Sequence, residues 1–456
     1  MNMRIPKNAE TIIRELMAHG FEAFAVGGCV RDSILGREPG DWDITTSAKP
    51  EQVKQIFHRT VDTGIEHGTV TVLMDKEAYE VTTYRVDGEY EDHRHPKEVT
   101  FTASLEEDLK RRDFTINAMA YNPETGLVDI FEGIQDLNRK VIRCVGNPGE
   151  RFDEDALRIL RAIRFSAQLG FEIDDATKDA MTERADTLKD VSAERIRVEL
   201  VKLLISNHPE KMKEACRLGL TRVVLPEYDR IVGIAQHTPN HLYDVEEHTI
   251  RAMQHIDAEP VLRLTMLLHD FGKPIVKKHD EGRDIFYKHP EVSADLSRTI
   301  LKRLKFDNYT LERVTRLVKW HGLKYLPNEI SVRRAMNRVG KDLFEDFIKV
   351  QRADVLAKHP KVIEGKLALL EQKEKIYRQI VERGDCFEVK TLAVNGKDLI
   401  QAGIKPGPLL GAVLDRLVEL VIDDQNLNTK DRLIQKALEV KDDPEIFKEK
   451  VYFFEK

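Results

Sequence analysis

Cysteine is scarce in this sequence: Cys29, Cys144, Cys216 and Cys386 are the only four among 456 residues. They are scattered along the chain, and no two of them form a C-x-x-C pair. This spacing argues against a disulfide framework and against a cysteine-rich zinc site. We expect buried or free thiols in a reducing cytoplasm.

Long hydrophobic runs are also lacking. No apolar segment reaches the length that is needed to span a bilayer, and residues 1–10 contain no apolar core of the kind found in secretion signals. These two absences predict a cytoplasmic protein without a membrane partner.

Positive charge is not in excess: the sequence contains 72 Lys and Arg residues and 79 Asp and Glu residues, which gives a formal net charge of −7. This balance excludes a protein coated in basic residues. It does not exclude a nucleic-acid partner, because a local basic stripe is sufficient for binding. A chain of this length predicts roughly two to four domains.

The most informative stretch is a glycine turn near the start of the chain. Residues 21–26 predict a short apolar strand, and residues 30–35 predict a short helix. Gly27 and Gly28 between them allow a tight turn whose backbone N–H groups approach a ligand closely. With Arg31 on the following helix, the natural occupant is an anion.

Asp41 and Asp43 follow, one residue apart, in a segment that ends in residues 44–46. If this segment is a strand, both carboxylates point to the same face. Two parallel carboxylates repel each other unless a cation lies between them, and hard oxygen ligands suit Mg²⁺. A phosphate-binding turn beside such a metal site predicts phosphoryl or nucleotidyl transfer. Either feature alone is common; their order and closeness carry the prediction.

The motif G-G-x-V-R-D-x-x-L-G over residues 27–36, followed by G-D-x-D-I over 40–44, resembles the signature of the bacterial-type (class II) tRNA nucleotidyltransferase and poly(A) polymerase family. The resemblance implies that Asp41 and Asp43 bind two Mg²⁺ ions and that Gly28 and Arg31 hold a triphosphate. It also implies a third carboxylate on a neighbouring strand. Glu80, in the predicted strand 78–84, is the candidate, and a solvated strand residue is the alternative.

A second motif, R-R-D-F-T-I-N-A-M-A over residues 111–120, also resembles this family. Arg112, with Arg111 as the weaker candidate, offers a forked donor to triphosphate oxygens. Asp113 and Asn117 either contact the sugar or fix the arginines. The charged segment 87–96 predicts a loop, similar in place to the family's flexible loop, although it departs from the commoner D-G-R-R-P form.

Residues 154–165 predict one helix on which four residues recur every three positions and form a stripe: Asp155, Arg158, Arg161 and Arg164. The three arginines need an anionic partner, and a triphosphate or RNA backbone would supply one. A carboxylate accepts a hydrogen bond from the exocyclic amine of cytosine or adenine, and a guanidinium beside it donates to the adjacent ring acceptor. Guanine and uracil do not present this pair of groups on the corresponding edge. The resemblance assigns this role to Asp155 and Arg158 and a supporting role to the E-R-I element at 194–196, where Glu194 is read as structural. A solvated helix face is the alternative.

Histidines dominate a later region. His248, the pair His269-Asp270, and Asp354 resemble the H…HD…D ligand set of the HD superfamily of metal-dependent phosphohydrolases. The resemblance implies a divalent transition metal, with Mg²⁺ as an alternative. Lys273 is placed to meet a phosphate. Two further histidines, His289 and His321, either complete a second metal site or touch the substrate.

These features predict an α+β chain: a mixed α/β nucleotidyltransferase head over 1–145, a helical neck over 146–235, an HD domain over 236–360, and a helical, tRNA-binding tail over 361–456. The predicted activity is template-independent addition of C, C and A from CTP and ATP to the 3′ end of tRNA, with a second phosphohydrolase activity in the HD domain. The alternatives are an A-adding or CC-adding enzyme or a poly(A) polymerase of the same family. A rival from another class is an HD phosphohydrolase with a regulatory nucleotide-binding head.

Overall fold

The structure is a computed structural model that describes residues 3–87, 99–444 and 446–447. The chain divides into two compact units, Met1–Asp229 and Arg230–Lys456. The predicted head and neck fall mainly in the first unit, and the predicted HD domain and tail fall in the second. The finer boundaries at 145 and 360 stay predictions. The predicted loop at 87–96 lies almost wholly outside the described residues.

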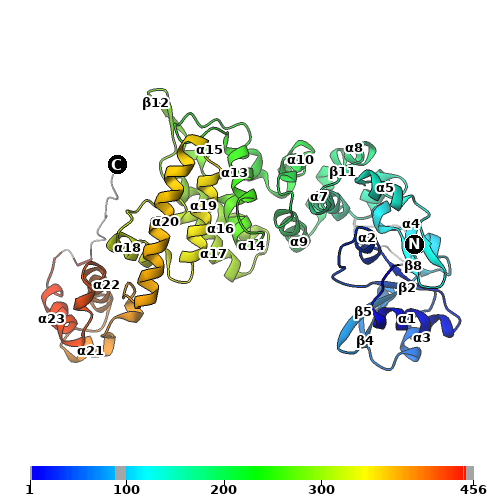
Figure 1. The fold of residues 1–456 in the computed structure, drawn as a ribbon, viewed down its shortest axis with the longest axis horizontal. Coiled ribbons are helices and arrows are strands. Elements are labelled where there is room, and N and C mark those ends of the chain that lie inside the picture. Colours follow the sequence, from blue (N-terminus) through cyan, green and yellow to red (C-terminus); the bar gives the residue numbers. More distant parts are fainter. Residues whose placement is uncertain (1–2, 88–98, 445, 448–456) are drawn as a thin grey trace. The chain divides into compact units, whose positions relative to one another are not determined.

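The first unit contains one large sheet and several short strand pairs (Figure 1). Its strands are β1 (Ala23–Val26), β2 (Ile44–Thr46), β3 (Thr60–Gly64), β4 (Thr69–Met74), β5 (Glu77–Thr83), β6 (Arg85–Asp87), β7 (Val99–Phe101), β8 (Ala120–Asn122), β9 (Gly126–Val128), β10 (Val141–Ile142) and β11 (Glu172–Ile173). Seven of them form the sheet in the order β3-β4-β5-β2-β1-β8-β9. Among the described strands of this sheet, β2 and β5 are the one parallel pair, with Ile44 opposite Val81, and this register decides which carboxylates meet.

The helices of the first unit begin with α1, whose apolar residues Ile12, Ile13 and Leu16 are buried against β1, β2 and α3. The helices are α1 (Lys7–Ala18), α2 (Gly28–Ile34), α3 (Pro50–Ile56), α4 (Leu105–Lys110), α5 (Gly133–Arg139), α6 (Pro148–Glu154), α7 (Leu157–Leu169), α8 (Asp175–Glu183), α9 (Ala193–Leu204), α10 (Lys211–Arg217), α11 (Thr221–Val224) and α12 (Pro226–Asp229). A short 3₁₀ turn, η2 (Thr115–Asn117), precedes β8.

Residues 127–143 do not form a hairpin. Helix α5 lies between β9 and β10, and β10 pairs in parallel with β11 instead of returning to β9. The reason is a local cap: the carboxylate of Asp129 accepts the backbone N–H groups of Gly133 and Ile134 at 2.7 and 2.9 Å. These bonds satisfy the first donors of a helix, so the chain turns into α5.

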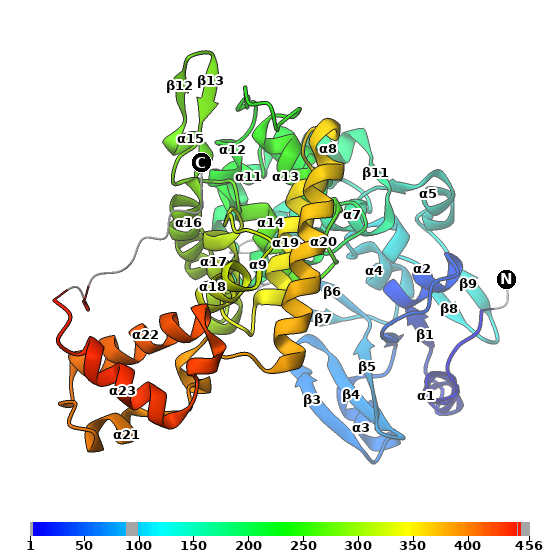
Figure 2. The ribbon, with the colours of Figure 1, turned by 60° about the vertical axis from the view of Figure 1, so that its left-hand side comes forward.

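The second unit consists of helices and one short hairpin (Figure 2). Its elements are α13 (Val245–Gln254), α14 (Pro260–Leu268), α15 (Lys273–Val276), β12 (Lys278–Asp280), β13 (Arg283–Ile285), α16 (His289–Arg303), α17 (Asn308–Trp320), α18 (Glu329–Val339), α19 (Phe344–Leu356), α20 (Pro360–Arg383), α21 (Gly396–Gln401), α22 (Pro408–Asp423) and α23 (Lys430–Val440). The long α20 packs against α18 and α19.

The predicted α+β class is therefore confirmed. All four cysteines are free thiols, as their spacing predicts. Across the described residues, no helix combines the length and the apolar character that crossing a membrane requires.

Candidate functional site

The glycine turn after β1 brings two arginines together. Gly27 has a φ of +83°, and a Cβ there would lie 3.0 Å from Nη1 of Arg112. Only glycine therefore suits both the backbone and the close approach of this guanidinium. Arg31, buried on α2, donates to Oδ1 of Asn117 at 2.7 Å. The turn thus carries fixed positive charge on two sides.

The two aspartates precede β2 instead of lying in it. The predicted strand is shorter than expected, because β2 begins at Ile44. The carbonyl of Asp43 nevertheless accepts the N–H of Val26 at 3.0 Å, so the pairing with β1 continues to this residue. Trp42 is buried, whereas Asp41 is exposed and Asp43 half-buried. The alternation places both carboxylates on the side opposite the indole.

Glu80 joins these carboxylates through the sheet register. It precedes Val81, which lies opposite Ile44, so Glu80 on β5 stands at the level of Asp43. Burial and the charge of Asp41 raise the pKa of Asp43 to about 6; Arg112 opposes this shift, and Glu80 adds to it. Three carboxylates that crowd in this way fit a hard divalent cation such as Mg²⁺, which would relieve their repulsion.

The role of Glu80 can be tested against a neighbour on the same strand. We expect Glu80→Gln to lower the rate of nucleotide addition by about 100-fold, because a carboxylate within a charge-stabilising site is typically worth about 3 kcal/mol. Glu77→Gln is the matched control, since Glu77 begins β5 and its carboxylate accepts from Asn8 and Tyr79 instead. Equal rates for the two variants would contradict a catalytic role and show that Glu80 is a solvated strand residue. The measurement is single-turnover incorporation of labelled CMP.

Asp108 on α4 is a fully buried carboxylate that sequence reasoning missed. Its oxygens lie 2.8 Å from Nη2 of Arg111 and 3.6 Å from Nη2 of Arg112, and it accepts the hydroxyl of Thr45 at 3.0 Å. Because Thr45 follows Asp43 by two residues, Asp108 links both arginines to the strand beside the aspartates. The available signal was an acid four positions before Arg112, on the same side of a helix.

The second motif fixes arginines, which was one of its two predicted uses. The amide of Asn117 accepts from Arg31 and donates to Oδ1 of Asp113 at 3.1 Å. Oδ2 of Asp113 accepts Nε of Arg161 at 2.7 Å. Burial raises the pKa of Asp113, but the charge of Arg161 and the hydrogen bond from Asn117 hold it at about 2. The head and α7 are therefore joined by one polar chain that is buried at Arg31, Asn117 and Asp113 and partly exposed at Arg161.

The single helix predicted over 154–165 is wrong. Helix α6 ends at Glu154, Asp155 is extended with a φ of −143°, and α7 begins at Leu157. Oδ1 of Asp155 accepts the N–H of Leu157 at 3.1 Å. An aspartate that caps the next helix competes with continuation of the previous one. Asp155 is therefore not part of the arginine stripe.

The arginine stripe does not lack anionic partners, as the sequence argument assumed. Each guanidinium meets a carboxylate of the chain: Arg158 meets Glu154 at 2.5 Å, Arg161 meets Asp113 at 2.7 Å, and Arg164 meets Glu199 at 2.5 Å. Repulsion among the arginines therefore does not require a bound phosphate.

Two residues around this stripe were missed. Phe165 receives the guanidinium carbons of Arg31, Arg161 and Arg164 at 5.0, 5.4 and 3.7 Å from its ring centroid, so it serves as a shared cation–π platform. Arg195 of α9 donates to Oδ2 of Asp155 at 2.8 Å. Asp155 thus has a guanidinium beside it, that of Arg195 in the E-R-I element. Glu194, read as structural, is exposed.

The second unit assembles the predicted histidine set. His248 comes from α13, His269 and Asp270 follow α14, and Asp354 comes from α19. His289 opens α16, and His321 follows α17. Their ligand atoms form two adjoining triads, each within 4.8 Å: His248 with His269 and Asp354, and Asp270 with His289 and His321.

The orientation of the imidazoles is uniform. Each Nδ1 lies beside a backbone carbonyl oxygen: His248 with Ala357 at 3.2 Å, His269 with Met266 at 2.6 Å, His289 with Phe286 at 2.7 Å, and His321 with Val318 at 2.7 Å. A carbonyl only accepts, so each Nδ1 carries the hydrogen and each Nε2 offers a lone pair. Nevertheless, Nε2 of His248 lies 3.3 Å from that of His269, and Nε2 of His289 lies 3.3 Å from that of His321.

Lone pairs that face each other at this distance fit a shared cation. Burial lowers the pKa of His321 to about 3 and also lowers the pKa of His248, which keeps these two imidazoles neutral and ready to act as ligands. Among the described residues, neither buried oxygen of Asp270 accepts a well-aligned hydrogen bond, although Nζ of Lys273 lies 2.6 Å from Oδ2. These donors suit a divalent transition metal.

A sheet that holds a glycine turn, clustered carboxylates and arginines in this order defines a nucleotidyltransferase head. Family models agree: "Poly A polymerase head domain" matches residues 23–143, "Probable RNA and SrmB-binding site of polymerase A" matches 170–232, and "tRNA nucleotidyltransferase domain 2" matches 285–437.

Relatives that match nearly the whole chain show to which family of nucleotidyltransferases it belongs. The CCA-adding enzyme of Levilactobacillus brevis is 37% identical over 429 residues, which are 93% of this chain and 96% of the relative. That of Streptococcus thermophilus is 36% identical over 433 residues, 94% and 95% of the two chains. The crystal structure of the Bacillus stearothermophilus CCA-adding enzyme in complex with CTP is 30% identical, with a TM-score of 0.73 over 96% of this chain and 98% of that one. This chain belongs to the family of CCA-adding enzymes, and the predicted family is confirmed.

Proposed function

We propose that this enzyme adds C, C and A to the 3′ end of tRNA, using CTP and ATP and no nucleic-acid template. The convergence of Asp41, Asp43 and Glu80 beside the Gly27–Gly28 turn carries the proposal. The relatives support it, because they are named CCA-adding enzymes and are similar over nearly the whole chain.

Asp41 and Asp43 would hold two Mg²⁺ ions, with Glu80 beside them. When bound, Mg²⁺ supplies positive charge to the phosphate oxygens and to the attacking 3′ hydroxyl. Gly28 lets the backbone approach the triphosphate, and Arg31 and Arg112 neutralise its oxygens. Asp108 would then orient Arg112, since its carboxylate lies 3.6 Å from Nη2 of this guanidinium.

Asp155 and Arg158 would select the base. Cytosine and adenine both present an exocyclic amine beside a ring acceptor, which a carboxylate and a guanidinium satisfy together. Arg195 pairs with Asp155, and Glu154 pairs with Arg158, so each of the two base-selecting residues has a second side chain that limits its motion. Arg161 and Arg164, fixed by Asp113 and Glu199, would order this pair or meet phosphates.

The pattern of incorporation tests this proposal. We expect CMP addition to tRNAs that end at the discriminator base or at the first C, and AMP addition to tRNA that ends in CC. An A-adding enzyme would leave the two shorter tRNAs unchanged, a CC-adding enzyme would stop before A, and a poly(A) polymerase would extend with AMP repeatedly. Failure to add CMP to the shortest tRNA would overturn the proposal.

We propose a second function for the histidine-rich centre of the second unit, metal-dependent phosphohydrolysis. The four Nε2 atoms and the carboxylates of Asp270 and Asp354 support one transition-metal ion in each triad, and Lys273 would meet a substrate phosphate. When bound, such an ion lowers the pKa of a coordinated water. The chain's own residues fix the imidazole tautomers through backbone carbonyls, which keeps the lone pairs aligned.

Metal analysis tests this second function without reference to activity. We expect His321→Ala to bind one Mn²⁺ or Ni²⁺ ion fewer per chain than the wild type, because it removes a ligand of one triad. His255→Ala is the matched control, since His255 is exposed at the end of α13 and lies outside both triads. CMP addition should be equal in all three proteins. The same metal content in His321→Ala and the wild type would contradict a metal in this triad.

A further inference from the structure

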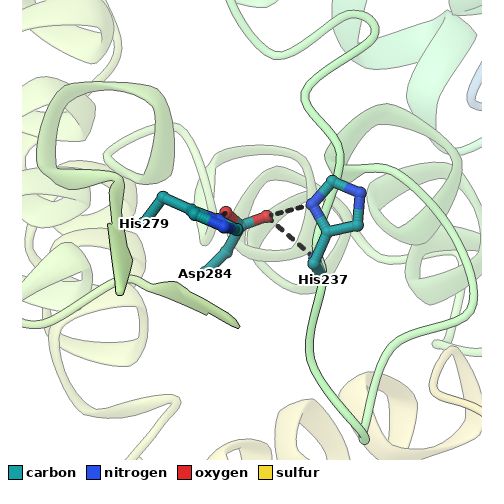
Figure 3. Close-up of side chains that lie close together, drawn as sticks. All are labelled: His237, His279 and Asp284. Atoms are coloured by element: carbon teal, nitrogen blue, oxygen red, sulfur yellow. Dashed lines mark hydrogen bonds and ion pairs between the residues drawn. The ribbon is translucent and has the colours of Figure 1, made fainter. Parts of the chain in front are cut away.

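A third cluster of metal-ligating side chains lies on the β12–β13 hairpin. His279 on β12 is the cross-strand partner of Asp284 on β13, so their side chains share one face of the hairpin. His237 comes from the segment before α13 and approaches the same carboxylate (Figure 3). Two of the three residues therefore come from one hairpin, and His237 comes from a segment 47 residues before Asp284.

The distances between these side chains match those between ligands of one ion. Nδ1 of His237 lies 2.9 Å from Oδ2 of Asp284, and Nδ1 of His279 lies 2.9 Å from Oδ1. One ligand atom from each residue falls within 4.8 Å of the others. At the tetrahedral angle, two bonds of about 2.0–2.1 Å place their ligand atoms about 3.3 Å apart, so each imidazole needs to move by only a few tenths of an ångström to surround an ion. Since a carboxylate only accepts, each Nδ1 carries the hydrogen in this arrangement, and metal binding shifts that hydrogen to Nε2.

We propose that His237, His279 and Asp284 form a further binding site for a divalent transition-metal ion of the Zn²⁺ type. Two imidazoles and one carboxylate form a ligand set that suits such ions better than it suits Mg²⁺. The imidazoles are 65% and 59% exposed, whereas the carboxylate is 1% exposed. The buried carboxylate anchors the site, and water completes the coordination on the open side. The proposal does not depend on the function proposed for either other site.

The surroundings hold Asp284 in place for this role. Its Oδ2 accepts the backbone N–H of His237 at 2.8 Å, and its own N–H donates to the carbonyl of His237 at 3.1 Å. Nζ of Lys277 lies 3.0 Å from Oδ2 and donates to the carbonyl of Ala235 at 2.6 Å. These contacts occupy Oδ2 and leave Oδ1, beside His279, as the better ligand atom.

The site also connects to the histidine-rich centre. Gln236, next to His237, accepts Nζ of Lys273 at 2.6 Å, and Lys273 lies beside Asp270. An ion on His237 would therefore fasten the segment that positions Lys273. This gives the third site a structural use, separate from any chemistry at the triads.

Equilibrium dialysis of the full-length protein against Zn²⁺, followed by elemental analysis, tests the site. We expect His237→Ala and His279→Ala each to bind one Zn²⁺ ion fewer per chain than the wild type, and His255→Ala to bind the same number as the wild type. His279→Ala combined with His321→Ala should bind two fewer than the wild type. If the triads bind no metal, the loss in His279→Ala remains, so the two proposals fail separately.

A spectroscopic variant identifies the ligand directly. His279→Cys keeps a metal ligand at this position, and titration with Co²⁺ should produce a thiolate-to-cobalt charge-transfer band that the wild type lacks. Equal Zn²⁺ content in the wild type and both alanine variants, with no such band, would overturn the proposal. The three side chains would then only fasten the hairpin through hydrogen bonds.

Discussion

Replacing Asp43 by asparagine is expected to abolish nucleotide addition and to leave the fold intact. Asparagine has nearly the same shape but no charge, so it cannot hold Mg²⁺ beside Asp41. Loss of a charge-stabilising group at the reacting phosphate predicts a decrease of about 1,000-fold or more, equivalent to about 4 kcal/mol. The thermal stability should not fall, because burial and Asp41 already disfavour the charged form of Asp43 and raise its pKa to about 6.

Single-turnover incorporation of CMP into tRNA that lacks its terminal CCA measures this effect. Asp62→Asn is the control, since Asp62 is an exposed residue of β3 that pairs with Lys54 at 2.9 Å. The Asp43→Asn variant should retain the full metal content of the histidine-rich centre. Nucleotide addition at more than a tenth of the wild-type rate would contradict the proposed role and favour a regulatory head on a phosphohydrolase.

Replacing Asp113 by asparagine is expected to destabilise the first unit by about 3 kcal/mol at pH 7, because it leaves the partly buried Arg161 without its carboxylate. The pKa of Asp113 is about 2 in the folded protein, below its ordinary value of 3.8. A carboxyl group whose pKa is lower in the folded protein than in the unfolded chain stabilises the fold at a pH above its unfolded-state pKa. This stabilisation is lost as the pH falls from about 4 towards 2. The wild type should therefore lose about 2 kcal/mol in this window from this residue alone, and the variant should not.

Urea unfolding followed by tryptophan fluorescence measures this difference. The chain has two tryptophans, Trp42 in the first unit and Trp320 in the second. A Trp320→Phe background leaves Trp42 as the reporter of the first unit. Asp175→Asn is the control, because Asp175 is 99% exposed at the start of α8. A difference below about 0.5 kcal/mol at pH 7 between Asp113→Asn and this control would contradict the buried network.

The parts of the head that sequence analysis anticipated are local. Gly27 and Gly28 predict a turn wherever they occur between a strand and a helix, and the turn is present with the positive φ that glycine allows. Asp41 and Asp43 reach the same side because one buried residue separates them. The cluster of the second unit was anticipated although its residues are distant in the chain, because the order His248, His269-Asp270 and Asp354 resembles a known ligand set.

The parts that sequence analysis missed depend on partners far away in the chain. Asp155 ends a helix because its side chain caps the next one, and local periodicity does not report such competition. The anions that neutralise Arg161 and Arg164 lie 48 and 35 residues away, so a stripe of arginines could not reveal them. Arg195 of α9 contacts Asp155, which lies between α6 and α7 and is 40 residues away in the chain.

By itself, the sequence determined the family, the chemistry-bearing residue types and the local turn and strand that present them, because short spacings control which side of one element a side chain occupies. Only the tertiary structure decided which charges pair, because pairing depends on the packing of elements that are distant in the chain. The β2–β5 register places Glu80 beside Asp43. The packing of the helices pairs Asp155 with Arg195, and it brings His237 to Asp284 on the hairpin.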